Sequence, residues 1–452
     1  MPEHLRPRWI RGRPRGIVAG ACALLAAATL AACGAEVENP PVLNFYTPAD
    51  GSEAYAAAAA ACTEAAGGRY IIAQQTLPKS ADDQRLQLAR RLVAGDSEVD
   101  IMGIDVVWTA EFAEAGWIAP WPADLAQVVE DGTLRAAYDT GTYEDRLYAA
   151  PLNTNTQLLW YREDLVPEPP ETWDQMIDMA VRLAEQDLPH YIEVQGAQYE
   201  GLTVWFNTLL ASAGGEIVTK DGEVGIAEGD AADVATGIMK RLATSPAADP
   251  SLPVSKENDA RLAFEAGLAA FQVNYPFVQA SINTPPPDGS GGGTFIDEAG
   301  RPTSVDTGRR VGDVFAWTAY PSVVPGEPAR VTIGGLNLAV STTSPNPDLA
   351  FEASVCLRNR ENQLTNALTA GVPPTLVEIY DDPQFREEYP AWEEIRNSLQ
   401  QASVRPETPA YQSISIILAS LLNPPAEIDP DTIVEQLAEG VRSAVNSVGL
   451  VP

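Results

Sequence analysis

The chain has 452 residues, with 29 lysine and arginine against 62 aspartate and glutamate, so its formal net charge is −33. Apolar residues make up 45 % of the chain, which excludes a disordered protein, and the length predicts two or three lobes rather than a single core. The charge argues against a nucleic-acid partner, because proteins bind phosphate backbones through lysine and arginine.

The first 32 residues are typical of a lipoprotein signal peptide. Arginines precede an apolar run, 17–30, that is shorter than the roughly 20 residues a membrane-spanning helix needs. The run ends in Leu30-Ala31-Ala32-Cys33, which resembles a bacterial lipobox, and 33–41 reads as a tether. We expect a lipid on Cys33 that anchors the protein to the outer face of the cytoplasmic membrane. An ordinary signal sequence with a chance cysteine is the alternative.

Two cysteines, Cys62 and Cys356, remain in the mature chain. In an exported protein they favour one disulfide, and two separate buried thiols are the alternative. The sequence contains no zinc or haem motif and only 2 histidines, so we expect no metal and no cofactor. A calcium ion held by carboxylates is left open.

Strands and helices alternate from residue 42 onward. Strand-like runs lie at 42–46, 70–73 and 99–104, and helical stretches at 52–66 and from the capping pair Ser80 and Asp83 to Gly95. This order predicts right-handed crossovers and a parallel sheet with both faces covered. Ligands bind beyond the carboxyl ends of such strands, and Asp105 lies at one of these ends.

A second α/β region follows an extended passage, 147–161, that we expect to run between lobes. Its helices are predicted at 173–185, 202–213 and 259–266, and its strands at 191–194 and 314–319. The run 331–340 is strand-like, 349–358 is helical, and a last helix is predicted to open at Asp429 and Pro430. We therefore assign 42–156 and 330–372 to a first lobe, and 157–329 and 373–452 to a second.

Four stretches, 84–92, 105–117, 155–161 and 331–340, closely resemble the extracellular solute-binding lipoproteins of bacterial ABC sugar importers, in particular the trehalose-binding lipoproteins of mycobacteria. The resemblance covers essentially the whole mature chain. It implies an α/β fold: a two-lobed, periplasmic-binding-protein-like clamshell in which each lobe is a mainly parallel sheet flanked by helices. It also implies a monomeric receptor that binds trehalose or a related disaccharide and delivers it to the permease and ATPase subunits.

A neutral sugar needs hydrogen-bonding groups for its hydroxyls and flat apolar surfaces for its C–H faces. The resemblance favours this ligand-binding role for Asp105, Asn155, Glu257, Tyr275, Gly335 and Arg405. Where the resembling proteins carry tryptophan, this chain has Tyr275. The structural alternatives are an N-cap for Asp105, turns for Asn155 and Gly335, a solvated first-turn carboxylate for Glu257, a core ring for Tyr275 and a surface ion pair for Arg405.

Carboxylates beside a sugar also describe a glycoside hydrolase, which is the competing class. The sequence shows no recognisable acid/base motif, and a lipid-anchored body of two lobes suits capture and delivery, so we expect a binding protein with no catalytic residue. Maltose-type oligosaccharides and glycerophosphodiesters are the alternative ligands, because related receptors share a fold and differ in side chains. Closure is expected to be a hinge motion about Asn155, 321–330 and 371–374.

Overall fold

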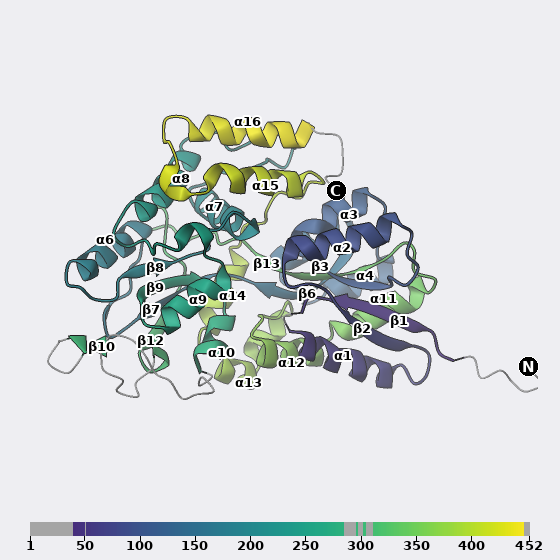
Figure 1. Ribbon diagram of the computed structural model, residues 1–452. Helices are drawn as coiled ribbons and strands as arrows, with labels where there is room; N and C mark the ends of the chain where they lie inside the picture. Colours follow the sequence, from purple (N-terminus) through teal and green to yellow (C-terminus); the bar gives the residue numbers. More distant parts are fainter. Residues whose placement is uncertain (1–38, 50, 284–294, 297–301, 304–310, 447–452) are drawn as a thin grey trace, which may run out of the picture. The chain divides into compact units, whose positions relative to one another are not determined.

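The computed structural model describes residues 39–49, 51–283, 295–296, 302–303 and 311–446. The chain divides after Pro40 into two units, and all the elements below belong to the second unit, Pro41–Pro452. The predicted signal peptide, Cys33 and most of the tether lie outside the described residues. The described part is built on two larger β-sheets with helices around them, and two further sheets have only two strands each (Figure 1).

The first sheet has five strands in the order β2-β1-β3-β13-β6. Their bounds are β1 Val42–Thr47, β2 Ile71–Thr76, β3 Ile101–Asp105, β6 Ala149–Asn155 and β13 Gly334–Val340. β1 runs parallel to β2 and β3, whereas β13 runs antiparallel to both of its neighbours, β3 and β6. β13 is thus the one reversed strand of this sheet, and it comes from the part of the chain that follows the second sheet.

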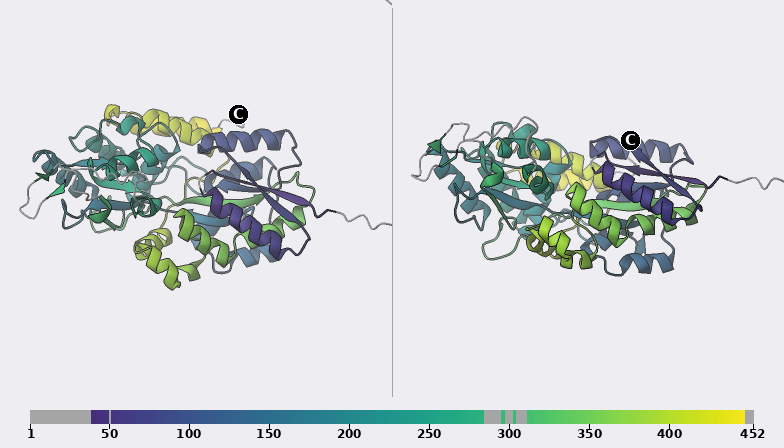
Figure 2. Two further views of the ribbon diagram at one scale, coloured as in Figure 1. Left: turned by 60° about the horizontal axis from the view of Figure 1, so that its bottom comes forward. Right: turned by 90° about the horizontal axis from the view of Figure 1, so that it is seen from below.

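Alternating side chains of the first sheet point into two different layers, as a strand period of two requires. Phe45 is buried against α1 (Ser52–Ala65) and α11 (Pro347–Leu357), and the next residue, Tyr46, is buried in the cluster formed with α2 (Ala81–Val93) and α3 (Thr109–Glu114). Helices therefore cover both faces of the sheet, as Figures 1 and 2 show.

The second sheet has four strands in the order β12-β7-β9-β8. Their bounds are β7 Leu158–Arg162, β8 Tyr191–Glu193, β9 Ala269–Asn274 and β12 Phe315–Thr318. β7 is antiparallel to β12 and β9, and β9 is parallel to β8, so β7 is the one reversed strand here. The predicted α/β fold is confirmed. In each sheet all strands but one point the same way, and the reversed strand adds antiparallel pairings.

Helices also cover both faces of the second sheet. One layer contains α6 (Trp173–Ala184), α7 (Glu200–Ser212) and α8 (Ala231–Ala243), with α15 (Tyr411–Leu422) and α16 (Ile433–Asn446) packed outside α7 and α8 (Figure 1). The other layer contains α9 (Glu257–Glu265) and α10 (Phe277–Asn283) together with α13 (Pro383–Glu388) and α14 (Trp392–Gln400). Further helices are α4 (Ala123–Glu130), α5 (Arg135–Thr140) and α12 (Arg360–Ala370). None of the described helices is both long and apolar enough to cross a membrane.

A segment that crosses between the sheets lies beside the irregular segment that joins α14 to α15. Ile333 donates its N–H to the carbonyl of Ser403 at 2.9 Å, and Ser403 donates its N–H to Val331 at 2.9 Å. The first segment leads from β12 to β13, and the second leads from α14 to α15. The chain also crosses between the sheets at residues 156 and 157, between β6 and β7.

The passage 147–161 is extended and leads from the first sheet to the second, as expected, and it contains the strands β6 and β7. Two other predictions about local structure need correction. Ser80 does precede α2, but its side chain makes no capping hydrogen bond. Asp429 accepts the N–H of Asp431 in a turn, and α16 begins only at Ile433.

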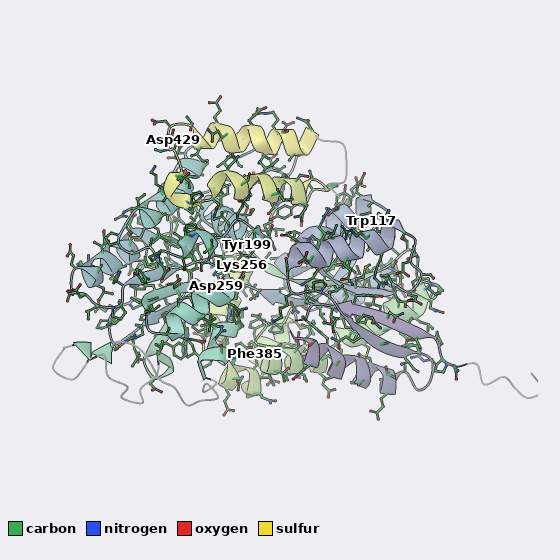
Figure 3. The ribbon with its side chains drawn as sticks, in the orientation of Figure 1. Trp117, Tyr199, Lys256, Asp259, Phe385 and Asp429 are labelled. Carbon is green, nitrogen blue, oxygen red and sulfur yellow. A yellow bond between two sulfur atoms is a disulfide. The ribbon has the colours of Figure 1, made fainter. Side chains whose placement is uncertain are left out.

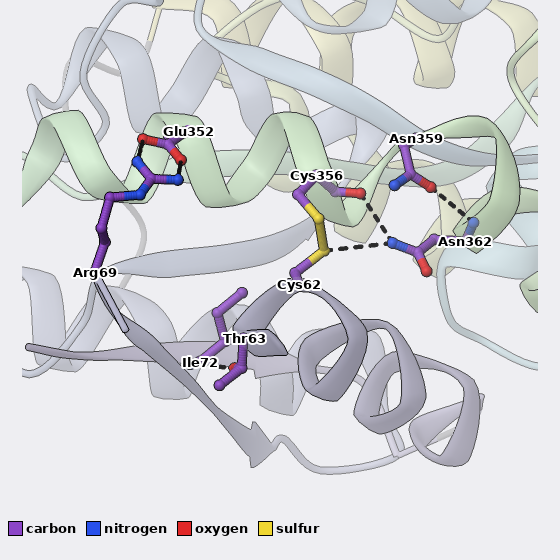
Figure 4. Close-up of a disulfide and its surroundings, with 8 residues drawn as sticks. All are labelled: Cys62, Thr63, Arg69, Ile72, Glu352, Cys356, Asn359 and Asn362. Atoms are coloured by element: carbon purple, nitrogen blue, oxygen red, sulfur yellow. Dashed lines mark hydrogen bonds and ion pairs between the residues drawn. A yellow bond between two sulfur atoms is a disulfide. The ribbon is translucent and has the colours of Figure 1, made fainter. Parts of the chain in front are cut away.

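A disulfide joins Cys62 in α1 to Cys356 in α11, with the two Cα atoms 5.8 Å apart (Figure 4). The amide of Asn362 lies beside the bridge and donates to the Cys356 carbonyl at 2.9 Å. The bridge therefore ties the first helix of the chain to a helix that follows β13, on one face of the first sheet.

Candidate functional site

The first sheet places two of the predicted ligand residues at one edge. Asp105 is the last residue of β3 and Asn155 is the last residue of β6. Both strands flank the start of β13, where Leu336 pairs with Asp105 and Gly334 pairs with Asn155. The two side chains therefore stand at the carboxyl ends of two co-directional strands on either side of β13, and the carboxyl ends of strands are where α/β sheets bind ligands.

Asp105 also serves as an N-cap, which is the structural role that the sequence predicted as the alternative to ligand binding. Its Oδ1 accepts the N–H of Val107 at 3.2 Å, at the start of the short 3-10 helix Val106–Trp108. This bond uses only part of the acceptor capacity of a carboxylate, so capping and ligand binding are compatible in one side chain.

The second sheet contributes the corresponding edge. Tyr275 follows β9 directly, and Glu257 is the first residue of α9. The amide of Asn274, at the end of β9, donates to the Glu257 carbonyl at 2.9 Å, which fixes the start of α9 against the end of the strand. Leu158, the first residue of β7, pairs with Asn274 at this same edge.

Arg405 lies between the two edges, in the segment that joins α14 to α15, beside 331–333. Its Nη1 donates to Glu200 Oε1 at 2.6 Å, and its Nη2 lies 3.5 Å from Asp105 Oδ1 and 3.3 Å from the Ile333 carbonyl. The Arg405 side chain is only 3 % exposed. Arg405 therefore forms a buried ion pair with Glu200, and not the surface ion pair that was its structural alternative.

Charged groups from both edges act on the Tyr275 hydroxyl. Burial raises the pKa of the Tyr275 hydroxyl above its ordinary value. The carboxylates of Glu257 and Asp105 raise this pKa further, whereas the Arg405 guanidinium lowers it. These influences place Asp105, Glu257 and Arg405 in electrostatic reach of one phenol. The structure thus brings together four of the six predicted residues.

Tyr199 and Lys256 lie close together at the start of α9, whose first residue is Glu257 (Figure 3). The Lys256 ammonium lies 4.9 Å from the centre of the Tyr199 ring. The backbone N–H of Lys256 donates to Asp259 Oδ2 at 3.1 Å. Burial raises the pKa of Glu257, and the neighbouring Tyr199 hydroxyl opposes this shift. Glu257 is therefore a half-buried carboxyl beside a phenol, and not a solvated first-turn residue.

Two buried amide oxygens near the first crossing point have no hydrogen-bond partner within the described part of the chain. They are Asn155 Oδ1 and Gln157 Oε1. The amide nitrogen of Gln157 is bonded to Gln195 at 2.6 Å, and Gln195 in turn donates to the Val273 carbonyl at 3.1 Å. These bonds orient the Gln157 side chain, and buried acceptors left unpaired are suited to the hydroxyl donors of a sugar.

Gly335 lies inside β13 with a φ of +133°, a conformation that favours glycine. A Cβ there would lie 2.3 Å from the Asn153 carbonyl oxygen of β6. Strand packing alone therefore explains this glycine, and a contact between Gly335 and a ligand stays a prediction.

Two cavities lie among the described residues, one beside the predicted site and one away from it. One beside the site is lined by Val106, Arg405 and Glu407 among others and measures about 10 Å³, room for about one water molecule. A groove of about 630 Å³ lies elsewhere, lined by the end of α7, the 324–330 segment and residues 400–402. None of the six predicted ligand residues lines that groove.

Sequence reasoning missed three residues of the site: Tyr199, Glu200 and Tyr411. Glu200 and Tyr411 each open a helix, a position where their residue types carry no ligand signal. Their role depends on packing between segments more than 200 residues apart, which a local pattern does not encode. As to metals, no group of three or more potential metal ligands occurs among the residues that the structure places.

Comparison with known proteins agrees with this architecture. A family model described as bacterial extracellular solute-binding protein matches residues 75–364. A probable ABC transporter-binding protein of Deinococcus radiodurans is 27 % identical to the chain over 350 residues, which cover 74 % of this chain and 75 % of the relative.

Three solved structures share the fold at low sequence identity. The maltose-bound MalE3 of T. maritima superimposes with a TM-score of 0.76 at 23 % identity, over 89 % of this chain and 99 % of the other. The acarbose-binding GacH receptor of Streptomyces glaucescens gives 0.74 at 19 % identity, over 91 % and 100 % of the two chains. A cyclic alpha-maltosyl-1,6-maltose binding protein of Arthrobacter globiformis gives 0.70 at 20 % identity, over 90 % and 99 %.

Proposed function

Because the chain belongs to the bacterial extracellular solute-binding protein family, we propose that it captures trehalose between its two sheets and delivers the sugar to an ABC permease. The observation that carries the proposal is the position of Arg405, which contacts Glu200 from the second sheet's helices and Asp105 from the first sheet. A ligand at this point meets groups from both sheets at once. Such an arrangement couples binding to closure.

The charge of the site supports a neutral ligand. Asp105, Glu200 and Glu257 bring carboxylates, and Arg405 brings the guanidinium that two of them share. A phosphodiester would add negative charge to an environment already dominated by carboxylates, which disfavours glycerophosphodiesters. Tyr199 and Tyr275 supply the flat rings that a sugar's C–H faces need.

The ligand is tested by isothermal titration calorimetry and thermal shift with trehalose, maltose and a glycerophosphodiester. A ligand at 100 times its Kd adds about 2.7 kcal/mol to the free energy of unfolding, so a true ligand raises the melting temperature clearly. We expect trehalose to give the largest shift. A larger shift with maltose would move the assignment to the maltose-type oligosaccharides that the similar structures bind.

We propose no catalysis at this site. Incubation with trehalose should leave the disaccharide intact, with no glucose released. Sustained glucose release that Glu257→Gln or Asp105→Asn abolishes would assign the protein to the glycoside hydrolases instead.

A lipid on Cys33 would hold this receptor beside its permease. The lipobox and the tether that follows support this placement. Mass spectrometry of the membrane fraction should find Cys33 as the first residue, carrying acyl chains. If Cys33→Ala leaves the protein equally bound to membranes, the anchor is wrong.

A further inference from the structure

The shortest ion pair of Arg405 is the 2.6 Å bond from its Nη1 to Glu200 Oε1. We propose that Glu200 is a positioning residue, which holds the Arg405 guanidinium so that its remaining N–H groups meet the sugar. The inference rests on the proposed function and deepens it, because it names what sets the geometry of the arginine.

Glu200 is held by three side chains from two segments, Arg405 from 401–406 and Tyr411 and Ser415 from α15. Its Oε1 accepts from Arg405 Nη1 at 2.6 Å and also from the Tyr411 hydroxyl, and its Oε2 accepts from the Ser415 hydroxyl. Ser415 itself lies 3.1 Å from Thr203 Oγ1, one turn further along α7. Each carboxylate oxygen is thus engaged by a fixed donor, so Glu200 has little capacity left for a ligand.

Arg405 depends on this support because its own segment is irregular. Residues 401–406 form neither helix nor regular strand, and they are held mainly through Ser403 and the crossing segment beside it. A long side chain on such a segment loses considerable rotamer freedom when it is fixed. A charge-assisted bond to Glu200 fixes it before the ligand arrives, which lowers the entropic cost of binding.

The two carboxylates around Arg405 hold it unequally. Glu200 is bonded at 2.6 Å, whereas Asp105, from the first sheet, lies 3.5 Å away and also caps Val107. If the sheets separate to admit a sugar, the longer contact to Asp105 is the one that gives way. Arg405 then stays with Glu200, and its orientation survives in the open form.

Arg405 has one further N–H donor that a ligand can use. Its Nε–H is buried and has no hydrogen-bond partner among the residues that the structure describes. Together with Nη2, whose contacts are 3.3 and 3.5 Å long, this edge of the guanidinium is the part available to a sugar hydroxyl. Glu200 holds the opposite nitrogen, Nη1, and so sets the direction in which the free edge points.

A double-mutant cycle tests this role by calorimetry with the sugar that binds the wild type best. Glu200→Gln keeps the shape of the side chain and removes its charge, and we expect its Kd to rise on the order of tenfold. In an Arg405→Ala background the same change should alter Kd less than about twofold, because the group being positioned is gone. Thermal shifts at millimolar sugar keep weak variants measurable.

Two further variants distinguish the positioning of Arg405 from a general loss of rigidity in the protein. Tyr411→Phe removes one bond to Glu200, and combined with Glu200→Gln it should bind like Glu200→Gln alone. Glu111→Gln breaks the equally buried Arg85–Glu111 pair between α2 and α3 and should leave Kd unchanged. An unchanged Kd in Glu200→Gln overturns the proposal, as does an equal loss in the Arg405→Ala background. A wild type that binds no sugar overturns the proposed function, and this inference with it.

Discussion

Asp105 and Arg405 are 300 residues apart in the chain, and their side chains lie 3.5 Å apart. One stands at the end of a strand in the first sheet, and the other lies between α14 and α15, two helices that pack with the second sheet. The distance between these two side chains therefore measures how closely the two sheets approach each other at the site.

Substitution of either residue should weaken sugar binding while preserving the fold. Removing one charged hydrogen-bonding partner costs about 1.5 to 3 kcal/mol, which is roughly ten- to over a hundredfold in Kd. We expect this loss for Asp105→Ala and for Arg405→Ala in calorimetric titrations, with melting curves recorded without sugar. Glu98→Ala, at an exposed position, is the control and should bind like the wild type. Wild-type affinity in both site variants would show that the site lies elsewhere.

The Cys62–Cys356 bridge should contribute strongly to stability. It closes a loop with a sequence separation of 294, and the chain-entropy model assigns such a loop about 6 kcal/mol, although measured contributions are typically about 2 to 4 kcal/mol. The double variant Cys62→Ser, Cys356→Ser should lower the free energy of unfolding in urea by about 2 to 5 kcal/mol. Alkylation of the unreduced, folded chain beginning after Cys33 should find no free thiol; two free thiols would contradict the bridge.

Gly335→Ala should destabilise the first sheet. The φ of +133° and the approach of a Cβ to 2.3 Å from the Asn153 oxygen both oppose a side chain, and backbone strain alone costs about 1 to 3 kcal/mol. Gly334→Ala is a matched control, because its Cβ would meet Asn155 at an ordinary 3.4 Å. Thermal melting compares the two. A Gly335→Ala protein with normal stability and weakened sugar binding would instead assign this glycine to the ligand.

Glu193 should make stability fall as the pH rises. Burial, with Asp249 beside it, raises the pKa of this carboxyl from 4.5 to about 8, and the side chain is 2 % exposed. Between these values the folded protein holds a proton that the unfolded chain has released. The contribution of Glu193 to the free energy of unfolding is therefore greatest below about pH 4.5. It declines by up to about 1.4 kcal/mol per pH unit until about pH 8.

Glu193→Gln mimics the protonated form and should remove this decline. Its melting temperature should match that of the wild type near pH 5 and exceed it near pH 8.5. The exposed Glu98→Gln serves as the comparison and should keep the wild-type slope. Parallel pH profiles for Glu193→Gln and the wild type would contradict the assigned titration.

The sequence predicted the fold well where periodicity is local. The strand, helix and strand expected at 42–46, 52–66 and 70–73 correspond to β1, α1 and β2 within a few residues. The passage 147–161 is extended and leads from one sheet to the other, as expected, but its division into β6 and β7 was not predicted, because both strands are buried on two faces. Hydrophobicity without a period gives no indication of where one strand ends and the next begins.

The candidate site was predictable only in part, for a different reason. Asp105 and Tyr275 follow directly on strands, so their placement at a sheet edge is a local property. Glu200 acts through Arg405 and Tyr411, which lie 205 and 211 residues further along the chain. Such a contact arises from tertiary packing, and a glutamate at a helix start has an ordinary local explanation in the helix dipole.

The position of β13 between β3 and β6 also bears on how the protein is made. During synthesis the first four strands of that sheet emerge long before β13, so the edges of β3 and β6 stay unpaired while the whole second sheet is added. Open strand edges invite pairing with other chains, and contacts between distant segments form slowly. The sheet that begins first is therefore completed last, and a fragment ending near Asn155 would lack the strand that joins its two halves.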